Sequence, residues 1–280
     1  MAMRTTQARV RRAIAAVSAG RPVVVTDEIA RDGHLVFAAD AATPKLMAFT
    51  VRHTSGYVRA ALPVAECERL NLPPMCQRGG GRSGAAAHRV SVDVTGTGTG
   101  ISARDRALTI AALAASESTA SDFRRPGHVV PVGSAPDGVL APSRGAAEAA
   151  VDLAGMAGRR RAGVFCEIVS RLRPTAMARG PELATFADEH GLPVVSIAEI
   201  AAYRLRTEPQ VIRTAETTVP SRLGDYRVVG YRGVHDGAEH MAVIIGAAGG
   251  DLPMPVHVHV ECLTGDVFGS LRCDCGDQLD

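Results

Sequence analysis

The chain has 280 residues, of which 46% are hydrophobic, and its formal net charge is +2. This length suits one large domain or two ordinary ones, and the small net charge predicts neither a nucleic acid partner nor a membrane partner. Lys45 is the only lysine, which excludes enzymes that need a second lysine and the lysine-containing phosphate loop. Six cysteines are too few for a disulfide scaffold, so we expect a reducing, cytoplasmic environment.

The first half of the chain alternates strands with helices. Apolar residues at helical spacing, Val10, Ala13, Ile14 and Val17, favour an amphipathic first helix over a signal peptide. Thr43 followed by Pro44 is typical of a capped helix start. The other elements expected here are strands at 21–28, 34–40, 56–63 and 90–94, helix 42–53, and a glycine-rich turn running into a helix within 95–116.

Two glycine-rich segments raise the question of phosphate binding. Residues 77–88 lack the strand–loop–helix context of a phosphate cradle, so we interpret them as a mobile loop. Residues 95–100 lead into a helix, where an anion can bind, although this short pattern is weak evidence by itself.

In the second half, helices are expected at 146–158 and 181–191 and strands at 162–169 and 192–197. The alternation of strands and helices predicts an α/β fold. The composition changes at 203–224, and the segments after it, 226–233, 240–248 and 254–261, read as strands. We therefore expect a boundary near residue 208, with domains at 1–207 and 208–280.

Cys262, Cys273 and Cys275 lie close together near residue 280. Their spacing differs from that of a zinc finger with two Cys-x-x-Cys pairs, yet three soft ligands suit zinc and leave a fourth position for water. Such a water ionises near pH ~7 and can attack an electrophile. Three buried or unpaired thiols are the alternative, and the spacing alone leaves both interpretations open.

The residues around these cysteines, "HVHVECLTGDVFGSLRCDCGDQL" with "DGAEHMAVIIG" upstream, resemble the opening of GTP cyclohydrolase II. The resemblance implies that Cys262, Cys273 and Cys275 hold a catalytic zinc ion. It also implies contacts to GTP from His257, Val258, His259, Val260, Glu261 and Gln278. His257 and Val260 replace an arginine and a serine of the family pattern. Because the family's domain continues beyond this point, we expect a truncated domain that binds zinc weakly and does not hydrolyse GTP.

Residues 8–206 resemble 3,4-dihydroxy-2-butanone 4-phosphate synthase. The motifs that carry the resemblance include "RPVVVTDE", "ATPKLMAFTVRHTSGYV", "TGISARDRALTI", "RRPGHVVPV", "EAAVDLAGMAG" and "HGLPVVSIAEIAAYR". The resemblance implies a mixed-sheet α/β domain, a homodimer, and conversion of ribulose 5-phosphate to a four-carbon phosphate and formate with Mg²⁺. His128 and Glu167 match residues that are essential in the family, so they are the catalytic candidates.

The same resemblance shows where this chain departs from the family. The two protein ligands of the metal fall on Ala30, in "VTDEIARDGH", and Ala146, in "SRGAAEA". A substrate arginine and a substrate aspartate of the family fall on Ile29 and His34, and an arginine of the second family motif falls on Ser143. Alanine has no ligand atom, so we expect a domain that keeps the synthase fold and loses the Mg²⁺ site.

Three functional hypotheses follow from these departures. The first is a fused riboflavin-biosynthesis protein with an inactive synthase domain and a truncated cyclohydrolase domain. The second is a non-catalytic dimeric scaffold, or a regulator of a complete paralogue. The third is a synthase that remains active because Asp27, Glu28 and Asp32 hold a relocated metal.

Overall fold

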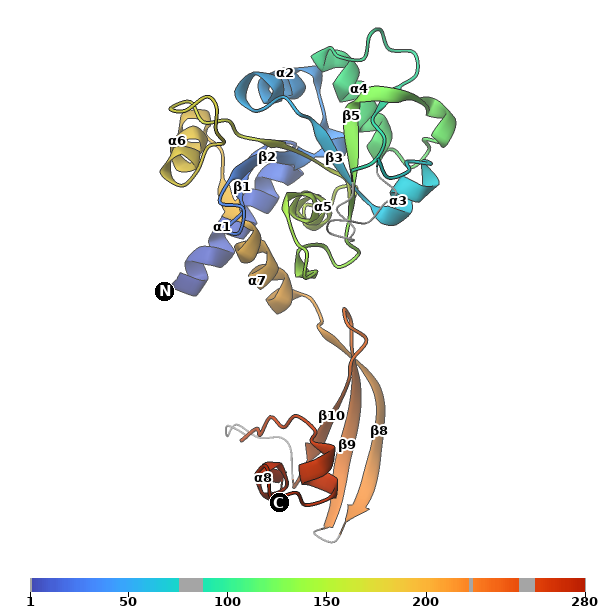
Figure 1. Cartoon of the computed structure of the whole chain (residues 1–280), viewed down its shortest axis with the longest axis vertical. Coiled ribbons are helices and arrows are strands. Elements are labelled where there is room, and N and C mark those ends of the chain that lie inside the picture. The colour runs from blue at the N-terminus through green and yellow to red at the C-terminus, as the bar shows by residue number, and fades with distance from the viewer. Residues whose placement is uncertain (1, 76–87, 222–223, 247–254, 280) are drawn as a thin grey trace. The chain divides into compact units, whose positions relative to one another are not determined.

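A computed structural model describes residues 2–75, 88–221, 224–246 and 255–279. The expected mobile loop at 77–88 therefore lies outside the described residues, except for His88. The chain divides into two compact units, Met1–Gln210 and Val211–Asp280, which are described separately below (Figure 1).

The first unit is built on one seven-stranded mixed sheet with the order β4-β5-β3-β6-β2-β1-β7. β3 runs parallel to β5 and β1 runs parallel to β7, while the other neighbouring strands are antiparallel. The sheet confirms the predicted α/β class. Its strands are β1 (Val23–Thr26), β2 (Gly33–Ala38), β3 (Arg59–Pro63), β4 (Val92–Val94), β5 (Phe123–Ser134), β6 (Gly163–Glu167) and β7 (Val194–Ser196).

Helices cover both faces of this sheet (Figure 1). The Thr43 hydroxyl accepts a hydrogen bond from the Leu46 amide at 3.1 Å, so the predicted cap at this helix start is confirmed. The helices are α1 (Ala2–Ser18), α2 (Pro44–His53), α3 (Val64–Arg69), α4 (Ala103–Ala114), α5 (Ala146–Met156), α6 (Pro181–His190) and α7 (Ile197–Thr207), with short 3-10 turns η1 (Ala39–Ala41), η2 (Ala120–Asp122) and η3 (Gly138–Leu140).

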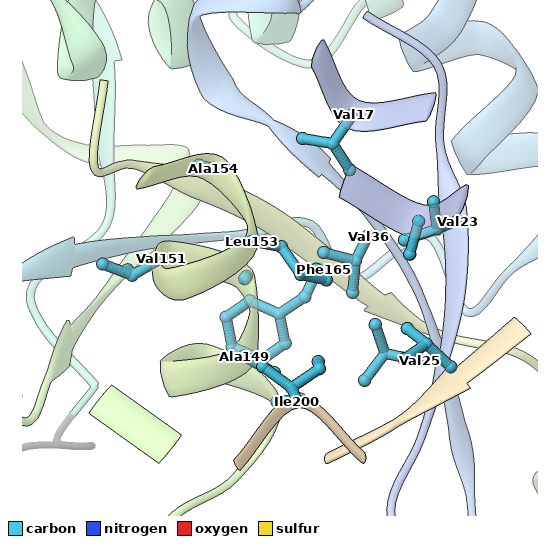
Figure 2. Close-up of a cluster of buried hydrophobic side chains, with 14 of the residues drawn as sticks. Val17, Val23, Val25, Val36, Ala149, Val151, Leu153, Ala154, Phe165 and Ile200 are labelled. Atoms are coloured by element: carbon cyan, nitrogen blue, oxygen red, sulfur yellow. The ribbon is translucent and has the colours of Figure 1, made fainter. Parts of the chain in front are cut away.

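The largest core cluster of the first unit lies between the sheet and helices α1, α5 and α7. Figure 2 shows how Val17 of α1, Leu153 of α5 and Ile200 of α7 converge on the valines of β1 and β2 and on Phe165 of β6. Almost all of α5 is buried, including its first residue, Ala146. A second cluster packs α2 and α4 around Met47, Ile110 and Leu113.

The second unit contains an antiparallel three-stranded sheet with the order β10-β9-β8. The strands are β8 (Val211–Ser221), β9 (Gly224–Gly233) and β10 (Glu239–Ile244), and they precede the π-helical turn η4 (Leu263–Val267) and the short helix α8 (Cys275–Leu279). The predicted strands at 226–233 and 240–248 correspond to β9 and β10.

Two features of this unit differ from the sequence analysis. The predicted strand at 254–261 is wrong, because residues 255–262 form no regular element and Val256, Val258 and Val260 are each at least 77% exposed. Conversely, β8 lies in the segment interpreted only as a change of composition. Charged residues interrupt the β-branched residues of β8, so the sequence pattern did not predict a strand. Pro220 is tolerated because β8 is an edge strand. Among the described residues, no helix has the length and apolar character that crossing a membrane requires.

Candidate functional site

Four side chains share one face of the first unit's sheet near its centre. His34 on β2 is the register partner of Glu167 on β6, and Arg59 on β3 is the partner of Phe165 on β6. Phe165 and Glu167 are two residues apart, so their side chains point to the same face of the sheet. The strand register therefore brings His34 and Arg59, which are distant in the sequence, to the catalytic candidate Glu167.

Arg59 forms an ion pair with Glu167. Its guanidinium carbon lies 4.2 Å from the centre of the Phe165 ring and 5.4 Å from that of Tyr57, which holds the cation in place from two sides. Glu167 also accepts a hydrogen bond from the Ser55 hydroxyl at 3.3 Å. The side chains of Arg59 and Glu167 are 11% and 22% exposed, so the carboxylate is neutralised inside the protein by an arginine. Sequence reasoning missed Arg59, because its partner is distant in the sequence.

His34 is buried beside this ion pair. Burial lowers the pKa of His34, and the Asp32 carboxylate only partly offsets this effect. The His34 Nδ1 atom lies 3.8 Å from Asp32 Oδ1, and neither atom has a hydrogen-bond partner among the described residues. The imidazole is therefore neutral at pH 7.

The loop that carries the acidic residues folds around Asp27. Its Oδ1 atom accepts hydrogen bonds from the backbone amides of Ile29 and Ala30, at 2.8 and 3.0 Å. This is the geometry of an Asx turn, in which the carboxylate caps its own loop. Within the parts of the chain that the structure describes, Asp27, Glu28 and Asp32 do not form a group of converging metal ligands.

The second catalytic candidate, His128, lies on β5, and β3 separates it from Glu167 on β6. Its Nδ1 atom lies 2.8 Å from Asp93 Oδ2, and its backbone amide donates to Asp93 Oδ1 at 2.9 Å. Asp93 is buried and was not among the predicted site residues, although it lies within the predicted strand 90–94. Gly100 has a φ of 88°, and a Cβ at this position would lie 2.0 Å from Asp93 Oδ2, so only glycine fits beside this pair.

Ala146 and Ala147 begin α5 inside the core. Both are buried in the same apolar cluster as Leu153, and the preceding Gly145 makes no side-chain cap. Glu148, in the same helical turn, is fully buried and accepts a hydrogen bond from the Ala135 amide at 3.1 Å. The helix start thus contributes packing and a structural carboxylate.

In the second unit, the thiols of Cys262, Cys273 and Cys275 converge. Their sulfur atoms all lie within 4.8 Å of one another, and the first two are 3.8 Å apart. Two sulfurs bound to one tetrahedral zinc at ~2.3 Å would lie about 3.8 Å apart, so the geometry fits this ion. Among the described residues, no other group of three or more histidine, cysteine, aspartate or glutamate side chains converges in this way. We call it the thiol site.

Cys262 and Cys275 of the thiol site differ in pKa. A hydrogen bond with the Thr264 hydroxyl is the main cause that lowers the pKa of Cys262 to about 7. Hydrogen bonds with Cys273 and Cys262 raise the pKa of Cys275 to about 12. In the metal-free protein, Cys262 is therefore the first of these two to lose its proton.

The residues expected to contact GTP lie before and after the thiol site. The segment that leads into Cys262 has no regular secondary structure and consists of His257, Val258, His259, Val260 and Glu261. The rings of its two histidines are 5.9 Å apart. Gln278 lies in α8 and donates to Asp274 Oδ2 at 2.7 Å. Their roles, and those of His128 and Glu167, stay predictions.

Known proteins match both units. A family model described as 3,4-dihydroxy-2-butanone 4-phosphate synthase matches residues 11–203, and one described as GTP cyclohydrolase II matches residues 212–280. The riboflavin biosynthesis protein RibBA of Rhodococcus erythropolis is 51% identical over 97% of this chain and 65% of its own length. RibBA of Salinispora tropica is 51% identical over 99% of this chain and 69% of its own length. The chain thus spans about two thirds of the length of these relatives.

Solved structures of synthases are also similar to this chain. The two-domain synthase RibBX of A. baumannii is 34% identical with a TM-score of 0.73, covering 85% of this chain and 70% of that one. A synthase in complex with two magnesium ions is 40% identical with a TM-score of 0.64, covering 70% of this chain and 95% of that one.

The mixed-sheet unit and the thiol-bearing unit define a two-domain protein of the synthase–cyclohydrolase class. The chain belongs to the family of riboflavin biosynthesis proteins in which 3,4-dihydroxy-2-butanone 4-phosphate synthase is fused to GTP cyclohydrolase II. Both resemblances read from the sequence are confirmed.

Proposed function

We propose that this chain is a riboflavin-biosynthesis protein of the fused type whose synthase domain is a dimeric scaffold without Mg²⁺-dependent activity. The observation that carries this proposal is that Ala30 and Ala146 occupy both positions at which the family resemblance places the metal ligands. Mg²⁺ prefers carboxylate oxygens, and alanine offers none.

The neighbourhood of the lost ligands supports the same proposal. Glu167 is paired with Arg59, so it is already neutralised without a metal ion. Asp27 is occupied in capping its own loop, which argues against the relocated site at Asp27, Glu28 and Asp32. Ala146 and Phe165 belong to the buried core of the first unit, which is consistent with a scaffold role.

For the second domain we propose a zinc ion at the thiol site, held by Cys262, Cys273 and Cys275. A zinc ion held there would lower the pKa of a bound water molecule. The chain's own residues would hold the ion through three thiolates and present the 257–261 segment and Gln278 to the nucleotide. GTP is the proposed ligand because the matching family acts on it.

Two metal-binding measurements on the full chain test the proposed zinc ion at the thiol site and the proposed loss of the metal site in the first domain. We expect about one zinc per chain, lost when Cys273 is replaced by serine, and we expect no Mn²⁺ bound to the first domain in a paramagnetic resonance titration at micromolar protein. A chain that binds no zinc would contradict the thiol site. Tight Mn²⁺ binding that Glu167→Gln abolishes would contradict the loss of the synthase metal site.

A further inference from the structure

Asp266 lies in the turn η4, between the first and second cysteines of the thiol site. Its Oδ2 atom accepts a hydrogen bond from the Cys262 backbone amide at 2.7 Å and lies 3.0 Å from His259 Nε2. Its own amide donates to the Cys262 carbonyl at 2.7 Å. The Asp266 side chain is 13% exposed, so these are sheltered contacts.

These hydrogen bonds fix the backbone of Cys262 on both sides. The amide of Cys262 is held by the Asp266 carboxylate, while its carbonyl is held by the Asp266 amide. A cysteine has one rotatable bond between Cα and Sγ, so a fixed backbone restricts the sulfur to few positions. One of these positions puts it 3.8 Å from the Cys273 sulfur.

The same carboxylate reaches a second functional segment. His259 belongs to the stretch expected to contact GTP, and its imidazole is only 17% exposed where it meets Asp266. We propose that Asp266 is a positioning residue, which holds Cys262 in place for the metal and ties the 257–261 segment to the thiol site. This inference rests on the proposed zinc role of the three cysteines.

Co²⁺ is a suitable probe, because thiolate ligation gives it charge-transfer absorption and a tetrahedral site gives it strong visible bands. We would titrate Co²⁺ alone into the metal-free full chain and into Asp266→Ala, Asp266→Asn and His259→Ala. Asp277→Asn is the matched control, since it removes an exposed carboxylate two residues after Cys275.

Asp266→Ala should weaken Co²⁺ binding about 10- to 100-fold, the usual effect of removing a partner that orients a metal ligand. It should also change the visible band intensity at saturation, because the Cys262 sulfur is no longer held. Asp266→Asn keeps one acceptor oxygen and should recover part of the affinity. His259→Ala should lose less than Asp266→Ala, because the bond to the Cys262 amide survives, and Asp277→Asn should match wild type.

The inference is overturned if Asp266→Ala binds Co²⁺ with wild-type affinity and spectrum, or if it loses no more than Asp277→Asn. It is also overturned if Asp266→Asn recovers nothing relative to Asp266→Ala. If the wild-type chain shows no charge-transfer band, the thiol site itself fails, which is a separate result.

Discussion

At the scale of single residues, Arg59 balances the charge of the partly buried Glu167 carboxylate. A carboxylate at Glu167 that is 22% exposed needs a positive partner, and the guanidinium between the Phe165 and Tyr57 rings supplies it. Arginine suits this position because its planar cation can stack on aromatic rings while pairing with a carboxylate. The charge balance around Glu167 is thus achieved by the chain itself.

Replacing Arg59 by methionine should therefore destabilise the first domain. The variant leaves Glu167 partly buried and unpaired, and we expect a loss of about 1–3 kcal/mol in the free energy of unfolding. Urea denaturation at pH 7 measures this loss. Arg171→Met is the control, because the Arg171–Glu189 pair is about half exposed and should be worth at most about 1 kcal/mol. Equal stability of Arg59→Met and wild type would show that the pair is not needed.

His34 should make the stability of the first domain depend on pH. The pKa of His34 is lowered in the folded protein, so the unfolded chain binds the proton more readily. The free energy of unfolding should therefore decrease as the pH falls below about 6.5. His34→Gln should flatten the slope of unfolding free energy between pH 7 and 5. The pKa values of His53 and His88 are lowered too, so the quantity to compare is the difference between wild type and this variant. Parallel pH curves would contradict the assignment.

At the scale of elements, the turn η4 and the helix α8 meet closely at Gly265. A Cβ at this glycine would lie 2.9 Å from the Cys273 sulfur and 2.8 Å from the Cys275 Cβ. The glycine is buried, so the approach of the two elements depends on its missing side chain.

Gly265→Ala should push η4 away from α8 and weaken zinc binding by at least about tenfold, with the first domain unaffected. Competition with a chromogenic chelator measures the affinity. Val267→Ala is the control in the same turn, since Val267 is 67% exposed. Wild-type affinity in Gly265→Ala would mean that the turn and the helix adjust freely.

The sequence predicts elements best where local chemistry decides them. Thr43 and Pro44 specify a helix start by themselves, and the stripe from Val10 to Val17 specifies a buried helix face. Residues 254–261 alternate like a strand, but residues 255–262 form none, because a strand also needs a neighbour to pair with. β8 was missed for the opposite reason, since β9 provides pairing that its mixed composition does not announce.

The candidate sites also differ in whether local sequence or a distant partner determines them. The cysteines are close in sequence and belong to a specific motif, so the thiol site could be found before the structure. Arg59, Asp93 and Asp266 could not, because each acts through a partner set by strand register or by a turn. Sequence spacing carries no information about such contacts until the fold is known.

At the scale of the whole molecule, the first domain has the architecture of the synthase family, and we propose that it lacks the family's metal ligands. The mixed sheet and its core match synthase structures, including one that binds two magnesium ions, yet Ala30 and Ala146 offer no ligand atoms. We interpret this combination as a fold that serves assembly of the chain.

The chain should therefore form a homodimer, as the resemblance to the synthase family implies. Light scattering at micromolar concentration should give twice the chain mass of 29.2 kDa. Removal of zinc with a chelator should leave this mass unchanged, because the thiol site lies in the second unit. A monomer under both conditions would contradict the proposed role of the first domain.

Formate release from ribulose 5-phosphate measures whether the synthase domain still performs Mg²⁺-dependent chemistry. The full chain with Mg²⁺ should release no formate above a blank, while a fused relative that carries both metal ligands serves as the positive control. Ala30→Glu alone should remain inactive, because Ala146, Ile29 and Ser143 are unchanged. Mg²⁺-dependent formate release by the unmodified chain, abolished by a chelator, would contradict the account.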